Sequence, residues 1–277
     1  MGSVTLTFRD AMCPPRRLYP SSLAALALLA GGCHSFELER TRFAIISVPA
    51  TAVAGGGYAT KPTAFFFEGS GIQLSSTQLG DQGCLDRPFA PVAPAAFTRI
   101  DAGAAVEVNL GGTDATLSPA PSLTGTTYRL PDEQSIPFTP GNEITLTIPG
   151  AVGGFPARVV RARTVEAFTP GPVAIPASTT DDLELTWTPV PSLPGSAMFY
   201  SFRYAATASA SIDREIACVF ADDGTGFVPA TTLSGFRNSG FRSVTAQRAL
   251  ISFERVGSAI THVTSTLLVP VPVVGAG

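Results

Sequence analysis

Apolar and polar side chains alternate along much of this chain with a period of two residues. Val106, Val108 and Leu110 alternate with small or polar residues, and the same pattern returns at 143–148 and at 183–188. Successive side chains of a β-strand point to opposite faces, so this pattern is typical of a strand with one face buried and one toward solvent. Beyond residue 33 no window shows a clear helical 3.6-residue period. The pattern therefore predicts an all-β protein.

Further strands are expected where β-branched and aromatic residues gather between Gly- and Pro-rich turns. These segments are 43–48, 64–67, 157–168, 198–204, 216–220, 243–253 and 260–269. Many short strands with frequent turns predict an antiparallel β-sandwich of the Ig-like or fibronectin-like kind. The length allows one large sandwich or two in tandem. We expect two, an N-terminal domain at 34–152 and a C-terminal domain at 153–277, because the Gly-rich stretch 150–154 follows a strand.

Composition and charge exclude several classes of protein. Hydrophobic residues make up 45% of the chain, which is enough for a packed core and excludes global disorder. The formal net charge is −3, and no basic cluster appears. A nucleic-acid partner is therefore not expected.

The N-terminus has the features of an export signal. Arg16 and Arg17 precede a small apolar run at 21–30, which is shorter than the roughly 20 residues that span a bilayer. The run ends in Leu28-Leu29-Ala30-Gly31-Gly32-Cys33, which resembles the lipobox of bacterial lipoproteins. An ordinary secretory signal cut nearby, with Cys33 incidental, is the alternative.

The lipoprotein resemblance implies both an anchor and a location. Residues 1–33 would be the signal peptide, and Cys33 would carry the lipid and become the mature N-terminus. His34, rather than Asp, follows the cysteine, which implies sorting to the outer membrane. We therefore expect an exported protein that is bound to the membrane of the cell envelope through its N-terminal lipid.

The rest of the chain resembles uncharacterised secreted bacterial β-sandwich proteins over about residues 99–270. The resemblance rests on Asp101-Ala102-Gly103 before a strand, on the strand at 183–188 and on the stretch 218–229. These are turn and strand residues, so the resemblance supports a secreted sandwich and brings no catalytic residue with it.

Two cysteines remain outside the leader and the lipid site. Cys218 lies on the apolar face of a predicted strand, whereas Cys84 lies in the polar, Gly-flanked stretch 80–84, which we interpret as a loop. An oxidising compartment permits a disulfide between them, and two free thiols are the alternative. There is no C-x-x-C motif, and we predict no metal site.

Candidate catalytic residues are few. His262 is the one histidine beyond His34 and lies in a predicted strand, and no Gly-x-Ser-x-Gly elbow supplies a nucleophile. The carboxylate pairs Asp181-Asp182 and Asp222-Asp223 lie in predicted turns, where Asp is favoured for local hydrogen bonding. We predict no catalytic residue and no cofactor.

A sugar-binding platform on a β-sandwich would need exposed, flat aromatic side chains. Trp187 shares a strand face with Leu183 and Leu185, so we expect it to be buried. Tyr200 and Tyr204 share another strand face, where core packing and a binding platform both remain open. The repeated Ser-Gly-Phe-Arg at 234–237 and 239–242 is interpreted as a flexible hairpin, with contact to anionic lipid heads or a partner as the alternative.

These observations favour a non-enzymatic, lipid-anchored envelope protein with a binding or structural role. Its expected partners are the membrane and an envelope protein or a glycan. A carbohydrate-binding or adhesive surface module is the alternative, and a hydrolase that uses a carboxylate pair is a third hypothesis.

The lipobox makes a direct prediction. In a Gram-negative host the chain should incorporate labelled palmitate and partition into detergent. Cys33→Ala should abolish the label and leave a soluble or unprocessed form. A Cys33→Ala chain that still labels and partitions as before would contradict the lipoprotein interpretation.

Overall fold

The fold was analysed in a computed structural model of the chain, which describes residues 41–69, 83–89, 98–122, 125–190 and 194–274. Residues 39–277 form one compact unit. The described part is all-β apart from a one-turn helix, α2 (Ser234–Arg237), and it includes no helix that could serve as a membrane span.

One large mixed sheet contains most of the strands. Its main path runs in the order β11-β10-β6-β7-β8-β3-β1-β18-β17-β14-β15-β4. The strands on this path are β1 (Thr41–Ala52), β3 (Thr63–Gly69), β4 (Gly83–Pro88), β6 (Val106–Leu110), β7 (Thr113–Ser122), β8 (Gly125–Arg129), β10 (Glu143–Ile148), β11 (Arg158–Arg163), β14 (Ser196–Ala205), β15 (Arg214–Ala221), β17 (Phe241–Val256) and β18 (Ala259–Val271). Short strands β2 (Tyr58–Thr60), β5 (Thr98–Arg99) and β9 (Ile136–Phe138) pair at its sides.

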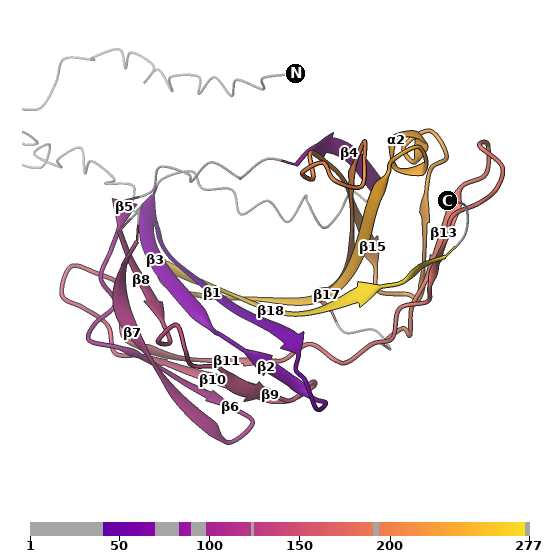
Figure 1. Ribbon diagram of the computed structural model, residues 1–277. Coiled ribbons are helices and arrows are strands. Elements are labelled where there is room, and N and C mark those ends of the chain that lie inside the picture. The colour runs from indigo at the N-terminus through magenta and orange to yellow at the C-terminus, as the bar shows by residue number, and fades with distance from the viewer. Residues whose placement is uncertain (1–40, 70–82, 90–97, 123–124, 191–193, 275–277) are drawn as a thin grey trace, which may run out of the picture. The chain divides into compact units, whose positions relative to one another are not determined.

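The centre of the sheet is the long curved hairpin β17–β18, with β1 beside β18 (Figure 1). Gly257 makes the hairpin turn with a φ of +60°, a left-handed conformation that favours glycine. β1 pairs with β18 in parallel, with Arg42 opposite Ala259 and Thr51 opposite Leu268. The first and last long strands of the body therefore lie side by side.

The sheet turns back on itself at β7. The first half of this strand pairs with β6, and its second half pairs with β8. This bend places the apolar faces of β6 and β10 in one core with those of β1 and β3. Phe66, Tyr128 and Phe155 form the aromatic cluster of this core, with Phe66 5.3 Å from Tyr128 and 5.0 Å from Phe155 between ring centroids.

A second aromatic cluster lies where a separate two-stranded sheet, β13 with β16, packs near β14 and β15. β13 (Leu183–Thr186) pairs with β16 (Thr225–Val228), and β12 (Val173–Ala174) pairs in parallel with β19 (Val273–Val274). The Trp187 ring lies 5.8 Å from Tyr200 and 6.0 Å from Phe220. Phe236 of α2 closes the core against Phe202 at 5.3 Å.

The predicted all-β class is confirmed, and each predicted strand overlaps a strand of the structure, although the one expected at 157–168 ends at Arg163. The large sheet is mixed rather than antiparallel throughout, because β1 and β18 are parallel neighbours, and the small separate sheet of β12 and β19 is parallel as well. The Ig-like topology and the tandem domains are not confirmed. The boundary expected at 152/153 falls inside the hairpin β10–β11, and both sides belong to the same compact unit.

A buried ion pair lies in the second cluster. Arg248 of β17 and Asp222 have side chains that are 1% and 4% exposed, with Nη2 to Oδ1 at 2.8 Å. Arg248 also donates to the carbonyl oxygens of Ala167, at 2.9 Å, and of Thr188. Asp222 accepts from Trp187 Nε1 at 3.0 Å and from Ser196 Oγ at 2.5 Å. The sequence pattern predicts a turn at Asp222 and gives no signal for a buried role of Arg248.

We predict that Arg248→Met lowers the free energy of unfolding by about 3–5 kcal/mol, because it leaves the buried Asp222 carboxylate without its partner. Arg161→Met is the matched control, since Arg161 is 76% exposed and lies 3.7 Å from Glu143. Its expected cost is under about 1 kcal/mol. Urea denaturation measures both values, and similar costs for the two variants would contradict this role for Arg248.

Candidate functional site

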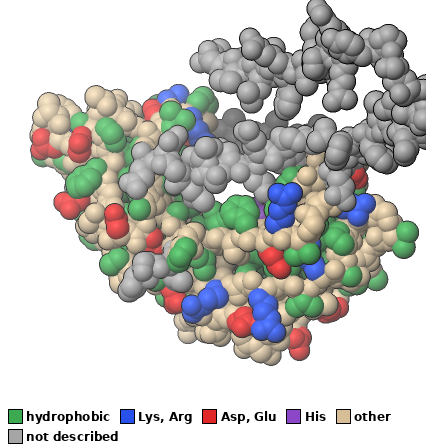
Figure 2. All heavy atoms as spheres, turned by 180° about the vertical axis from the view of Figure 1, so that it is seen from behind, with side chains coloured by type: hydrophobic (Ala, Val, Ile, Leu, Met, Phe, Trp, Pro, Cys, Tyr) green, Lys and Arg blue, Asp and Glu red, His purple; other side chains and the backbone are tan. Residues whose placement is uncertain are grey.

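The face of β4, β15, β14 and β17 that points away from the Trp187 cluster carries a pocket of about 710 Å³. Strand alternation explains its lining, because Tyr200 and Phe202 point into the core while Phe199 and Ser201 point to the pocket side. Because the lining side chains come from alternate positions of paired strands, the pocket is a feature of a regular sheet rather than of a long loop. On the surface seen in Figure 2, basic and acidic side chains are interspersed.

A row of three charged side chains crosses the pocket. Arg87 on β4 is opposite Glu215 on β15, and Glu215 is opposite Arg203 on β14. Arg87 donates to Glu215 Oε2 from Nη2 at 2.8 Å and from Nε at 3.1 Å. Ser201 Oγ donates to Glu215 Oε1 at 2.6 Å. Opposite charges on facing positions of neighbouring strands stabilise their register.

These contacts decide the ionisation of Glu215. Burial alone would raise its pKa. The hydrogen bonds from Ser201 and Arg87 and the charges of Arg87 and Arg203 outweigh burial and hold the pKa below its usual value. Glu215 therefore remains ionised near neutral pH and is poorly suited to act as a general acid.

Arg87 and Arg203 differ in their hydrogen bonding to Glu215. The Arg87 side chain is 53% exposed, although it binds Glu215. The Arg203 guanidinium lies 4.7 Å from the centroid of the Phe89 ring, and its Nε, 3.7 Å from Glu215 Oε1, is buried without a hydrogen-bond partner in the described part. The row thus carries one negative and two positive charges, and the half-exposed Arg87 guanidinium can also donate to a ligand's oxygen atoms.

Apolar and amide side chains line the remainder of the pocket. Phe199 faces Gln247 across β14 and β17, and Gln247 faces Leu268 across β17 and β18. Leu268 and Leu85 are 37% and 64% exposed. An aromatic ring beside an amide group can bind both the apolar and the hydroxyl-bearing parts of a ligand.

A disulfide joins the strand at the pocket's edge to its neighbour. Cys84 and Cys218 are opposite each other in the register of β4 and β15, and their sulfur atoms are 2.07 Å apart. Interpreting Cys84 as a loop residue was wrong, because it lies in β4. β4 pairs on only one side, so its side chains are mostly exposed and its sequence resembles that of a loop.

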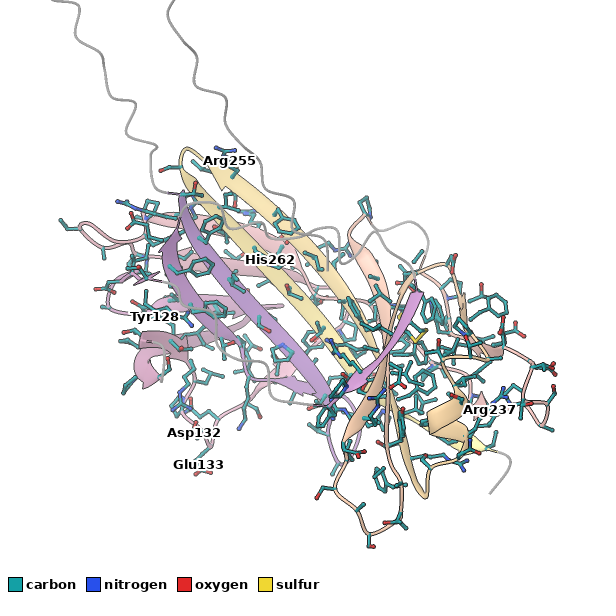
Figure 3. All side chains as sticks on the ribbon, turned by 90° about the horizontal axis from the view of Figure 1, so that it is seen from above. Tyr128, Asp132, Glu133, Arg237, Arg255 and His262 are labelled. Atoms are coloured by element: carbon teal, nitrogen blue, oxygen red, sulfur yellow. A yellow bond between two sulfur atoms is a disulfide. The ribbon has the colours of Figure 1, made fainter. Side chains whose placement is uncertain are left out.

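His262 lies outside this pocket, in β18 as predicted. Its ring stacks on Phe253 with centroids 4.5 Å apart, and its Nε2 lies 2.9 Å from Thr264 Oγ1. Figure 3 shows His262 on the long β17–β18 hairpin. Burial lowers the pKa of His262, so the ring is neutral near pH 7. Among the described contacts of this ring, the one hydroxyl group is that of Thr264, a residue of the same strand.

The other aromatic candidates are core residues. Trp187, Tyr200 and Tyr204 are 5%, 2% and 6% exposed, so the predicted burial of Trp187 is confirmed and the two tyrosines pack in the core. Burial raises the pKa of Tyr200 far above its usual value. These three rings do not form an exposed platform.

The predicted turn acids have structural partners. Asp182 Oδ1 accepts from the backbone N–H of Ala230 at 2.8 Å, and Asp223 Oδ1 accepts from that of Thr225 at 3.2 Å. Among the described residues no group of three or more His, Cys, Asp or Glu side chains could hold a metal ion.

The first Ser-Gly-Phe-Arg segment is helical. Interpreting it as a flexible hairpin was wrong, because Ser234–Arg237 forms α2 and Phe236 is fully buried. The leader, with Cys33 and the lipobox, lies outside the described residues.

We predict a pH-dependent role for Glu215. A carboxyl whose folded-state pKa lies below its unfolded value stabilises the fold above the unfolded pKa, and this contribution is lost as the pH falls through the folded pKa. Glu215→Gln should therefore cost about 1–3 kcal/mol at pH 7 and progressively less as the pH falls below about 4.3. Urea denaturation at several pH values measures this, with the exposed Glu143→Gln as control. An equal cost at all pH values would exclude the proposed ionic role.

Comparison with known proteins gives no family for this chain. No protein-family model matches it, and no curated protein matches it. Function must therefore be argued from the geometry and chemistry of the pocket itself.

Proposed function

We propose that this chain is a non-enzymatic cell-envelope protein, exported and anchored through a lipid on Cys33, that binds a partner in the pocket on β4, β15, β14 and β17. The lipobox-like Leu28-Leu29-Ala30-Gly31-Gly32-Cys33 supports the anchor, and the residue after Cys33 supports the outer membrane. The partner is an envelope protein or a glycan rather than a nucleic acid.

The observation that carries the binding role is the paired state of the charged groups in the pocket. Glu215 is held by Arg87 and Ser201, and the lowered pKa keeps it ionised. Such a carboxylate orients neighbouring groups and does not exchange protons near neutral pH. A preformed pocket on strands joined by a disulfide is suited to binding a ligand.

A glycan-binding or adhesive role is the second candidate. It is favoured by Phe199 beside Gln247, with the half-exposed Arg87 guanidinium in the same pocket. A sugar ring presents apolar faces to an aromatic side chain and hydroxyl oxygens to such donors. A hydrolase is disfavoured, because Glu215, Asp222 and Asp182 are engaged in the ion pairs and hydrogen bonds described above.

The two aromatic clusters suggest how the body is divided. We propose that each aromatic cluster, the one around Phe66 and the one around Trp187, is the core of one Ig-like or fibronectin-like half. The two halves share the long strands β1, β17 and β18, which is compatible with a single compact unit.

The pocket can be tested by measuring how the processed, lipid-bearing chain in detergent binds to a glycan array and to proteins of an envelope extract. The double variant Phe199→Ala/Gln247→Ala should weaken the retained interaction at least about tenfold, as expected for central binding residues. Phe253→Ala is the control, since Phe253 is a phenylalanine of the same sheet, is 52% exposed and does not line the pocket. Retention of glycans would select the second candidate, and equal retention by both variants would exclude the pocket.

A further inference from the structure

The tip of the β17–β18 hairpin lies beside the start of β1. The backbone N–H of Arg42 donates to Ser258 O in the hairpin turn at 3.0 Å. Figure 3 shows Arg255 at this end of the hairpin and Arg237 in α2 at the opposite end of the view. β1, the first described strand after Cys33, therefore begins beside the hairpin tip.

This end carries exposed apolar side chains. Val256, next to the turn, is 56% exposed, and Phe253 is 52% exposed. Val152 is fully exposed in the loop before β11, where Ala151 N–H donates to Phe155 O at 3.0 Å. Arg158 connects this loop to the hairpin, because its guanidinium lies 5.2 Å from the centroid of the Phe155 ring and donates to Val256 O at 3.4 Å. We call Val152, Arg158, Phe253 and Val256, together with Arg42 and Arg255, the hairpin-tip surface.

Basic side chains frame the exposed valines. Arg255 is exposed and donates to Gly257 O at 3.3 Å, while Arg42 and Arg158 are half-buried. Two acids lie among them, since Glu68 is opposite Arg42 in the register and Glu254 interacts electrostatically with Arg158. Arginines beside exposed apolar groups match an interface with anionic headgroups and acyl chains.

Chain length limits how far this end can lie from the anchor. Thr41, where β1 begins, is the eighth residue after Cys33, and a chain spans at most about 3.3–3.6 Å per residue. A lipid on Cys33 would thus keep Thr41 within roughly 29 Å of the lipidated residue. Because the hairpin tip lies beside the start of β1, the same limit brings it near the bilayer.

We propose that the hairpin-tip surface rests on the bilayer that holds the lipid, with Val256 and Val152 in the headgroup region and Arg255 and Arg42 against anionic headgroups. This inference rests on the proposed lipid anchor at Cys33. It assigns the tip a second, reversible membrane contact that orients the pocket relative to the bilayer.

Tryptophan fluorescence can test this contact in the lipid-bearing chain, reconstituted in vesicles of phosphatidylethanolamine and phosphatidylglycerol with brominated acyl chains. Val256→Trp is the reporter, and Phe227→Trp is its matched control because both native side chains are 56% exposed. Phe227 lies by the disulfide, with its carbonyl oxygen 3.9 Å from Cys84 Sγ. The one native tryptophan, Trp187, is buried and gives the same background in both.

Emission of the Val256→Trp chain should be quenched severalfold more than that of the Phe227→Trp chain. Adding Arg255→Glu should reduce this quenching in anionic vesicles. Adding Arg129→Glu should not, because Arg129 of β8 is opposite Thr63, at the end of β3 that lies away from Arg42. Equal quenching of the two reporters in chains that stay vesicle-bound would overturn the hairpin-tip contact and leave the anchor intact. Chains that remain outside the vesicles would overturn both the anchor and this inference.

Discussion

The buried ion pair between Arg248 and Asp222 fixes how the rest of the C-terminal part of the chain packs. Removing two charges from water costs several kcal/mol per ion unless their hydrogen bonds are satisfied. Here Asp222 accepts from Arg248, Trp187 and Ser196, and Arg248 also binds two backbone carbonyls. These contacts come from five separate segments, so the charges are satisfied only when β13, β14, β15 and β17 occupy their native positions together.

The binding face is a consequence of that packing. With β14, β15 and β17 held in register by their core side chains, the opposite face brings Arg87, Glu215 and Arg203 into one row. The disulfide at Cys84 adds an edge strand that has little apolar surface of its own to hold it. Core and pocket are therefore two faces of the same strands, and a change of register by one residue would exchange them.

Parallel pairing of β1 with β18 joins the N-terminal and C-terminal parts into one body. Parallel neighbours cannot be connected by a tight turn, and here the whole body lies between the two strands in sequence. The same pairing brings the start of β1, and with it the attachment to the leader, beside the β17–β18 turn. Where the proposed anchor enters the body is thus determined by the sheet topology.

Local patterns in the sequence determined the strand positions, the burial of Trp187 and the absence of helical periodicity, because alternation and turn residues act over a few neighbours. They also located Cys84 and Cys218 without deciding between a disulfide and free thiols. Only the tertiary structure decided that Cys84 lies in an edge strand, that Asp222 is buried against Arg248, and that Phe236 closes the core from a helical turn. The pocket's row of Arg87, Glu215 and Arg203 was likewise beyond sequence reasoning, since its members are 128 residues and 12 residues apart. Each of these features depends on which strands pair and in which register, and that choice is made by long-range packing rather than by any local pattern.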